Sequence, residues 1–108
     1  ESEAQMDAVT AVSGSGPGYV FHFVEALAAA GEAQGLAPDL AMTLARATVS
    51  GAGALLDASE DSATALRESV TSQKGTTAAG LDVLMADLPD LMRRTVAAAA
   101  DRSRELGT

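Results

Sequence analysis

Hydrophobic residues recur along this chain at spacings of three and four, which is the period of an α-helix. No segment shows the sustained alternation of hydrophobic and polar residues that marks a half-buried strand. Helices are predicted over residues 3–12, 17–34, 38–58, 63–70 and 77–88, and from a break at Pro89 to Leu106. The pattern therefore predicts an all-α fold of five to six helices.

The boundaries between these helices rest on residues that start or stop a helix. Residues 13–18 hold three glycines and a proline, which predicts a tight turn, and Pro17 suits the first turn of the next helix. Gly35 is the expected C-terminal cap of that helix. Residues 59–62 are all polar and are expected to separate two further helices.

The two long central helices carry the main hydrophobic residues. One side of the helix over 17–34 has Val20, Phe21, Val24, Leu27 and Ala28, and Tyr19, Phe23 and Ala30 widen it. In the helix over 38–58 the expected core residues are Leu40, Leu44, Ala47, Val49 and Leu55. Gly51 and Gly53 weaken that helix, which we expect close helix-to-helix approach to offset. Because a small domain can hardly bury a helix that is hydrophobic over most of its circumference, a partner subunit is expected to cover it.

Composition excludes several classes of function. A net charge of −8, with only seven scattered Lys and Arg residues, argues against binding to nucleic acid or to an anionic membrane surface. The absence of cysteine excludes disulfides and thiol catalysis, and predicts a cytoplasmic protein. No apolar run approaches the roughly 18 residues of a membrane span. The 108 residues are expected to form one domain over residues 1–108.

Several catalytic motifs are absent. Residues 14–18 are rich in glycine, but the dinucleotide fingerprint needs a glycine where Tyr19 stands, and no strand precedes them. Lys74-Gly75-Thr76 has the wrong order for a P-loop. The lone His22 lies within a helix, where a packed or hydrogen-bonded role is expected. Asp57, Glu60 and Asp61 lack the alternation of a calcium loop, so no metal site is expected.

The connection over residues 71–77 has more hydroxyl groups than a link between two helices requires. It delivers Gly75, Thr76 and Thr77 to the start of a helix, where unpaired N–H groups and the positive end of the helix dipole favour a carboxylate or phosphate. Gly75 would let a ligand approach the backbone closely. The alternative is a purely structural role, in which Thr76 or Thr77 caps the helix.

Two segments together resemble a known family. Residues 7–21 (DAVTAVSGSGPGYVF) resemble the opening of the pyrroline-5-carboxylate reductase dimerisation domain, and residues 66–72 with 75–81 resemble its signature loop and helix. The resemblance continues through Glu25-Ala26-Leu27, Gly31, Gly35-Leu36 and residues 102–106, so it covers nearly the whole chain.

The resemblance implies an interlocked dimerisation domain of the 6-phosphogluconate dehydrogenase C-terminal type. Such enzymes reduce 1-pyrroline-5-carboxylate to L-proline with NADPH or NADH in proline biosynthesis, and an N-terminal Rossmann domain, which this chain lacks, holds the nucleotide. The implied partners are a second copy of the chain and, by further assembly, a decamer. The chain, which opens without methionine, is expected to be a piece of a longer protein and inactive alone.

The resemblance also implies roles for particular residues. Thr77 matches the catalytic threonine that hydrogen-bonds the ring nitrogen. Ser72, Gly75 and Thr76 match the groups around the substrate carboxylate. Val70 matches a residue at the edge of the site, Glu60 a more distant acidic neighbour, and Pro17 a segment near the nicotinamide.

One departure from the family concerns Gln73-Lys74, which stand where the family has Pro-Gly. A glycine of positive φ at that place would make Lys74 strained, whereas the ammonium group of Lys74 could instead reinforce carboxylate binding. Two alternative functions stay open. One is a non-catalytic helical oligomerisation module. The other is the helical domain of another Rossmann-coupled imine or hydroxyacid dehydrogenase, although residues 40–56 offer only Arg46 where such domains present a catalytic Lys or Asp.

Overall fold

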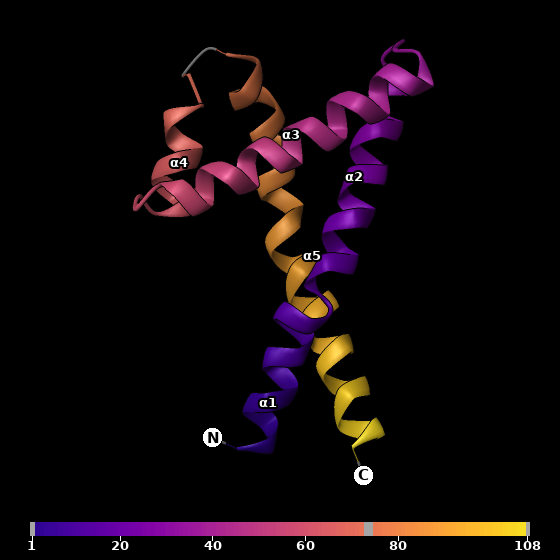
Figure 1. Cartoon of the computed structure of the whole chain (residues 1–108), viewed down its shortest axis with the longest axis vertical. Helices are drawn as coiled ribbons and strands as arrows, with labels where there is room; N and C mark the ends of the chain where they lie inside the picture. Colours follow the sequence, from indigo (N-terminus) through magenta and orange to yellow (C-terminus); the bar gives the residue numbers. More distant parts are fainter. Residues whose placement is uncertain (1, 73–74, 108) are drawn as a thin grey trace. The chain divides into compact units, whose positions relative to one another are not determined.

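The computed structural model describes residues 2–72 and 75–107, and the described residues form helices and no strands (Figure 1). In chain order the elements are α1 (Glu3–Val9), the π-helix η1 (Thr10–Gly14), α2 (Gly16–Ala33), α3 (Pro38–Ala58), α4 (Ala63–Ser69) and α5 (Thr76–Leu106). The predicted all-α class is confirmed. Gln73 and Lys74 lie outside the described residues.

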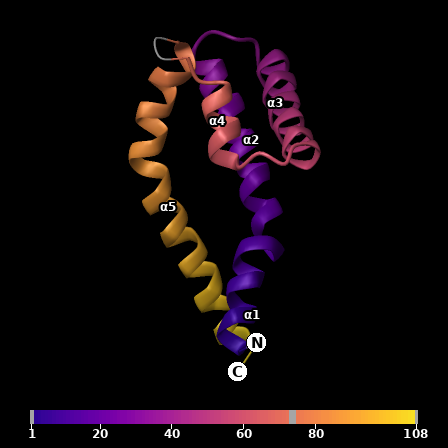
Figure 2. The same ribbon diagram turned by 90° about the vertical axis from the view of Figure 1, so that its left-hand side faces the viewer.

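The first compact unit combines the two ends of the chain, up to Pro17 and from Thr64 onward. Helices α1 and η1 lie beside the C-terminal part of α5 in both Figure 1 and Figure 2. The hydroxyl of Ser103 donates a hydrogen bond of 2.7 Å to Oδ1 of Asp7, and Ala11 is fully buried. A side-chain hydrogen bond and one buried alanine thus join segments that are distant in the sequence.

The predicted tight turn over residues 13–18 is wrong. The chain continues from α1 into η1, where the amide of Ser15 donates to the carbonyl oxygen of Thr10 at 2.8 Å. Ser15 itself keeps right-handed helical backbone angles, and α2 begins at the next residue. Packing of Ala11 against the rest of the unit supports this wider turn, which the glycines alone do not reveal. The expected place of Pro17, in the first turn of α2, is confirmed.

The predicted break at Pro89 is also wrong, because α5 continues through it. Proline removes one hydrogen bond from the turn before it, so a continuous helix needs support nearby. Asp90 in the following turn forms exposed ion pairs with Arg93 at 2.8 Å and Arg94 at 3.0 Å, which offset only a small part of that cost, roughly 0.3–0.5 kcal/mol each. These pairs span three and four positions, the spacing that stabilises a helix.

The second compact unit, Gly18–Ala63, is built on the pairing of α2 with α3. Its buried core consists of Ala28, Ala41 and Ala45, with Val24 packed against them. A methyl group added to Gly31 would lie 3.5 Å from the side chain of Ala41, so small residues let the two helices approach closely here. The connection between them is short, and the helices diverge away from it (Figure 1).

The end of α2 confirms the predicted cap. Gly35 has a φ of 102°, a left-handed angle that favours glycine. The amide of Leu36 donates to the carbonyl oxygen of Gly31 at 3.2 Å, and the amide of Gly35 donates to that of Glu32 at 2.9 Å. These two bonds form a Schellman motif, which satisfies carbonyl groups at the helix end.

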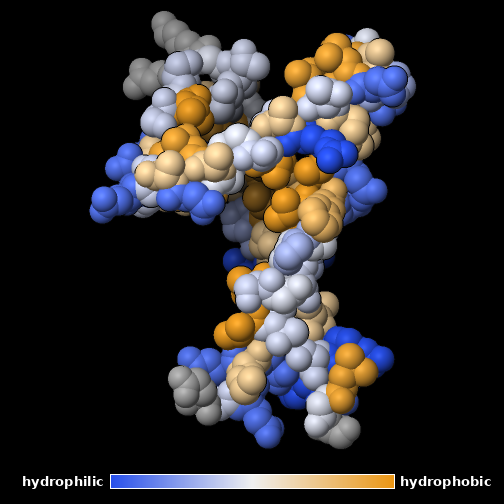
Figure 3. Space-filling model, viewed as in Figure 1, coloured by the Kyte–Doolittle hydropathy of each residue, from blue (hydrophilic) through white to orange (hydrophobic). Residues whose placement is uncertain are grey.

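The expected core of α3 is wrong within this chain for four of its five residues, and only Val49 is half-buried. Leu40 and Leu44 are each 48% exposed, and alanines form the core instead. Nothing lies within 4 Å of a Cβ added at Gly51 or Gly53, so the expected close approach of helices occurs at Gly31 instead. Leucine side chains would hold the helix axes further apart than the Gly31 contact allows. Hydrophobic surface is consequently visible on the outside of the molecule (Figure 3).

Candidate functional site

The connection between α4 and α5 begins with two hydroxyl groups that have structural partners. The hydroxyl of Thr71 donates to the carbonyl oxygen of Arg67 at 2.6 Å, and that of Ser69 donates to Leu66 at 2.7 Å. These oxygen atoms belong to the last turn of α4, where the amide of Val70 also donates to Arg67 at 3.3 Å. Ser69 and Thr71 therefore bond carbonyl groups at the end of α4, and for Thr71 this explains one of the hydroxyl groups of the connection.

The turn that leads into α5 brings Ser72 and Gly75 together. The amide of Gly75 donates to the carbonyl oxygen of Ser72 at 3.2 Å, and a Cβ at Gly75 would collide with the Ser72 hydroxyl oxygen. The φ of Gly75 is −88°, which any residue can adopt. Glycine here leaves room for the Ser72 hydroxyl in its observed position, and the backbone angle does not call for glycine.

The cap of α5 differs from the structural alternative that the sequence left open. Gly75 occupies the N-cap position, so capping by Thr76 or Thr77 is wrong, and no side chain makes a capping hydrogen bond. The first bond of the helix joins the amide of Ala79 to Gly75. The amides of Thr76, Thr77 and Ala78 are left for a ligand or for water.

The electrostatics of this helix start favour an anion. The first turn of α5 contains no acidic residue, so nothing in that turn offsets the positive end of the helix dipole. Thr76 and Thr77 are exposed. In the described part of the chain, no hydrogen bond engages the hydroxyl groups of Ser72, Thr76 or Thr77. Three hydroxyls and three amides close to the start of α5 are therefore available, which suits a carboxylate.

The remaining candidate residues are not part of the group formed by Ser72, Gly75, Thr76 and Thr77. Val70 is exposed and directly precedes the turn. Pro17 lies in the first turn of α2, within the same unit, and no described hydrogen bond joins it to the turn. Glu60 is exposed in the connection between α3 and α4, which belongs to the other unit. Lys74 falls outside the described residues, so its role stays a prediction.

The residues for which the sequence predicts no catalytic role have ordinary surroundings. His22 is exposed, and its Nδ1 atom lies 3.0 Å from Oε1 of Glu25 one helical turn away, which confirms a hydrogen-bonded role. Over residues 2–72 and 75–107, no three His, Asp or Glu side chains are grouped to hold a metal ion. The same part of the chain has no helix long and apolar enough to cross a membrane.

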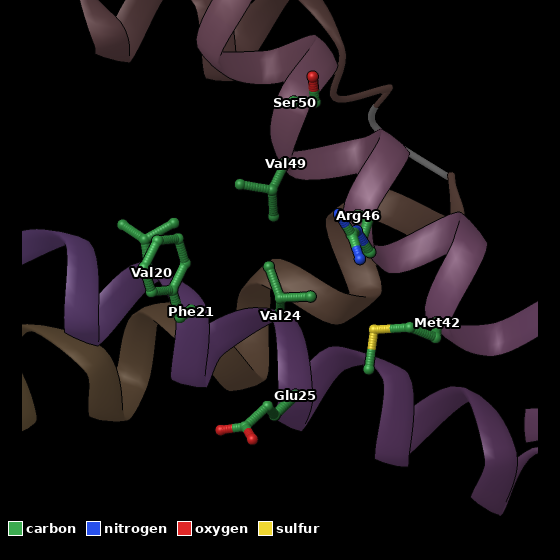
Figure 4. A pocket seen from close by; sticks show the side chains of 8 residues that line it. All are labelled: Val20, Phe21, Val24, Glu25, Met42, Arg46, Val49 and Ser50. Atoms are coloured by element: carbon green, nitrogen blue, oxygen red, sulfur yellow. The ribbon is translucent and has the colours of Figure 1, made fainter. Parts of the chain in front are cut away.

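Sequence reasoning missed a second feature, a hollow of about 460 Å³ between α2 and α3 (Figure 4). Its lining is formed by Val20, Phe21, Val24, Glu25, Met42, Arg46, Val49 and Ser50. The signal was present in the spacing, because the α3 residues of this set fall on one helical face. The sequence analysis considered Arg46 only as a substitute for a catalytic residue and did not place it on this face of α3.

Comparison with known proteins agrees with both the fold and the two motifs. Residues 3–106 match the family model described as pyrroline-5-carboxylate reductase dimerisation. The pyrroline-5-carboxylate reductase of Arabidopsis thaliana is 45% identical over 105 residues, which cover 96% of this chain and 38% of that protein. The enzyme of the same name from Pseudomonas aeruginosa is 43% identical over 107 residues, covering 98% of this chain and 39% of that protein.

Solved structures show the same relationship. The pyrroline-5-carboxylate reductase of Coxiella burnetii superposes with a TM-score of 0.92 at 40% identity, covering 98% of this chain and 40% of that one. The Plasmodium falciparum pyrroline carboxylate reductase, solved with NADP bound, superposes with a TM-score of 0.90 at 33% identity, covering 100% and 42%. The chain spans about two fifths of the length of these relatives. It belongs to the pyrroline-5-carboxylate reductase dimerisation family.

Proposed function

We propose that this chain is the substrate-binding and dimer-forming part of an enzyme that reduces 1-pyrroline-5-carboxylate to L-proline with NADPH or NADH. The observation that carries the proposal is the uncapped start of α5, where three amides have no partner and the Ser72 hydroxyl lies against Gly75. Membership of the family supports the choice of substrate among the possible carboxylates.

The start of α5 would hold the substrate carboxylate. Amides of Thr76, Thr77 and Ala78 donate to its oxygen atoms, and the Ser72 hydroxyl adds a further donor beside them. Hydrogen bonds to a charged group contribute roughly 1.5–3 kcal/mol each, about twice the neutral value. Because these donors belong to a helix and a tight turn, they fix the orientation of the ring as well as its affinity.

Thr77 would then address the ring nitrogen. Reduction delivers a hydride to the carbon of the C=N bond, and the nitrogen becomes a secondary amine after taking a proton. A hydroxyl group can orient this nitrogen in both states, because it donates to a lone pair and accepts from an N–H. This chain would contribute positioning and electrostatics, while the nicotinamide supplies the hydride.

The nucleotide itself does not fit the residues of this chain. Residues 14–18 are the end of a π-helix and the start of α2, with no strand before them, so they lack the setting of a dinucleotide site. A separate Rossmann domain would bind the nucleotide, with Pro17 near the nicotinamide. The chain alone should accordingly be inactive. A cytoplasmic location, and assembly of dimers into a decamer, belong to the same proposal.

A second candidate function is a non-catalytic oligomerisation module. The exposed hydrophobic residues of α2 and α3, among them Val20, Phe21 and Leu44, favour association with another chain whether or not catalysis occurs. The two functions make different predictions about ligands at the start of α5.

A fusion enzyme tests the proposal. We would join residues 2–107 to the nucleotide-binding portion of the Pseudomonas aeruginosa relative and measure NADPH oxidation with pyrroline-5-carboxylate. We expect proline formation by the fusion and none by the chain alone. In parallel, L-proline titrated into the ¹⁵N-labelled chain should shift the amide signals of Thr76, Thr77 and Ala78. An inactive, well-folded fusion without these shifts would favour the oligomerisation module.

A further inference from the structure

Ser72, whose hydroxyl lies beside the start of α5, is held on its C-terminal side by Gly75. The carbonyl oxygen of Ser72 accepts a hydrogen bond of 3.2 Å from the amide of Gly75, and a Cβ added at Gly75 would collide with the Ser72 hydroxyl oxygen. Ser72 is exposed, so packing does not fix its side chain. Because the rotamer of a side chain depends on its backbone angles, the backbone on the N-terminal side of Ser72 must also be fixed.

Helix packing within the chain contributes little to fixing that side. Helix α4 is seven residues long and has no buried residue. The principal contacts between helices of this unit join α1, η1 and α5, and α4 takes no part in them. The place where the chain leaves α4, and with it the position of Ser72, therefore depends on hydrogen bonds at the end of the helix.

Thr71 makes two hydrogen bonds to the last turn of α4. Its amide donates to the carbonyl oxygen of Glu68 at 3.1 Å, three positions back, and its hydroxyl donates to that of Arg67 at 2.6 Å, four positions back. In a helix that continued, the amide itself would bond the carbonyl four positions back. The hydroxyl thus takes the place of the amide at Arg67, and the chain can leave the helix at this residue.

The hydroxyl of Thr71 is the main partner of the Arg67 carbonyl. The amide of Val70 also donates to this oxygen, but its length of 3.3 Å exceeds the usual range for an N–H···O bond, whereas 2.6 Å is a short O–H···O bond. Thr71 is half-buried, so a polar group that lost its partner there would be costly. A side chain that bonds the backbone in this way competes with the helix and stops it.

Ser69 provides an internal comparison. Its hydroxyl donates to the carbonyl oxygen of Leu66 at 2.7 Å, a bond of almost the same length as that of Thr71. Ser69 is the last residue of α4, however, and its bond lies wholly within the helix. Loss of the Ser69 hydroxyl should therefore leave the connection in place, although the chemical change is the same.

We propose that Thr71 is a positioning residue of the carboxylate site, whose hydroxyl ends α4 at Ser69 and so holds the Ser72 hydroxyl beside the start of α5. Thr71 itself would not touch the substrate, and the inference rests on the proposed function of that site. Without the hydroxyl, the amide of residue 71 would turn to the Arg67 carbonyl and add a residue to the helix. The backbone of Ser72 would then rotate, and its hydroxyl would leave Gly75.

Crystal structures of the ligand-free fusion enzyme test the positioning directly. Thr71→Val keeps the shape of the side chain without the hydroxyl, and Thr71→Ser keeps the hydroxyl without the methyl group. We expect α4 to end at Ser69 in the wild type and in Thr71→Ser, and to be longer in Thr71→Val, with the Ser72 hydroxyl displaced from Gly75. Ser69→Ala is the matched control and should resemble the wild type. An unchanged Ser72 in Thr71→Val would overturn the proposal.

Kinetics of the same variants test the consequence for the substrate. A carboxylate is bound equally in the ground state and in the transition state, so Thr71→Val should raise the KM for pyrroline-5-carboxylate by about tenfold and change kcat by less than about twofold. Thr71→Ser should restore most of the loss, and Ser69→Ala should show none. In a Ser72→Ala background, Thr71→Val should add less than about twofold, because it acts through Ser72. A full additional effect there, or a fall in kcat alone, would contradict positioning.

The outcomes separate this inference from the proposed function. A wild-type fusion enzyme that neither turns over pyrroline-5-carboxylate nor binds L-proline overturns the proposed function and the carboxylate site with it, whereas the ligand-free structures still decide whether Thr71 holds Ser72. An active wild type whose KM is the same in Thr71→Val overturns the role of Thr71 and leaves the proposed function intact. Urea unfolding of each variant shows whether a change in KM reflects a general loss of stability.

Discussion

The start of α5 and the hollow between α2 and α3 both contain groups that lack a partner within the chain, but the groups are of different kinds. At the start of α5 the unsatisfied groups are polar: three amides and three hydroxyls within a few residues of one another. In the hollow they are apolar and come from two helices, with Arg46 as the one unpaired arginine of the described chain. The first arrangement suits a small anion, and the second suits a protein surface.

This difference has a physical origin. A hydrogen-bonding site can be assembled from one turn and one helix end, because directional bonds act over about 3 Å. Association through apolar surface requires area, so it must gather side chains from several turns of two helices. The two regions should therefore respond to different substitutions, and each can be damaged without the other.

The largest effect is expected from Phe21→Asp. Phe21 is 68% exposed within the chain, so the substitution should leave the folded chain intact while placing a charge in the dimer contact. Loss of its burial in both halves of a symmetric dimer should raise the dissociation constant at least ~100-fold. Sedimentation equilibrium measures this. Val83→Asp is the control, since Val83 is 70% exposed and does not line the hollow that contains Phe21. An equal effect of the two substitutions would show that the hollow has no special part in the dimer.

Thr77→Ala should damage the other region. If the hydroxyl orients the ring nitrogen, its loss should lower the kcat/KM of the fusion enzyme by roughly 10- to 100-fold, the equivalent of one hydrogen bond to a charged group. The dimer should be unchanged. Thr95→Ala provides a control on the same helix, because the Thr95 hydroxyl already donates to Leu91 at 2.8 Å. Similar kinetics for the two variants would remove Thr77 from the site.

Paired glycine substitutions sharpen the contrast. Gly75→Ala should force the Ser72 hydroxyl out of its place and weaken proline binding by about tenfold, with little change in stability. Gly35→Ala should do the reverse, since alanine at a φ of 102° is strained and lowers the free energy of unfolding by about 1 kcal/mol. Titration with L-proline measures the affinity of each variant, and urea unfolding measures its stability. If either substitution changed both the affinity and the stability, the two regions would not be independent.

The smallest effect is expected at a contact outside both regions. Ser103→Ala removes the hydrogen bond to Asp7 and should lower the free energy of unfolding by about 1 kcal/mol, without changing proline binding. Ser13→Ala is the comparison, because the exposed Ser13 hydroxyl only donates to the carbonyl oxygen of Val9 within the same helical segment. Urea denaturation measures both, and an equal loss would mean that the Asp7 contact adds nothing.

Much of the fold could be predicted because helix limits depend on nearby residues. Gly35 ends α2 through its left-handed angle, and Pro38 begins α3 at the predicted residue. Pro89 misled the prediction because a proline weakens or kinks a helix without necessarily ending it, and α5 continues on both sides of it. The sequence did not predict the π-helical turn at Thr10–Gly14, because glycines permit many conformations and tertiary packing selects one of them.

For the candidate site, the sequence indicates the residues but not their arrangement. The hydroxyl-rich connection and the family motifs together point to Ser72, Thr76 and Thr77. The sequence leaves capping by a threonine open as an alternative, whereas the structure places Gly75 at the N-cap and the Ser72 hydroxyl against it. That arrangement depends on how the turn closes, a relation between residues that composition does not contain.

The sequence by itself determined the all-α class, the course of the central helices and the family, because helix period, caps and short motifs are local properties. Only the tertiary structure decided which hydrophobic residues are covered. The close approach of α2 and α3 at Gly31 admits alanines and leaves leucines such as Leu40 and Leu44 outside. The same packing places Arg46 and Glu25 in the lining of one hollow between α2 and α3 without an ion pair between them, an arrangement that no local pattern reveals.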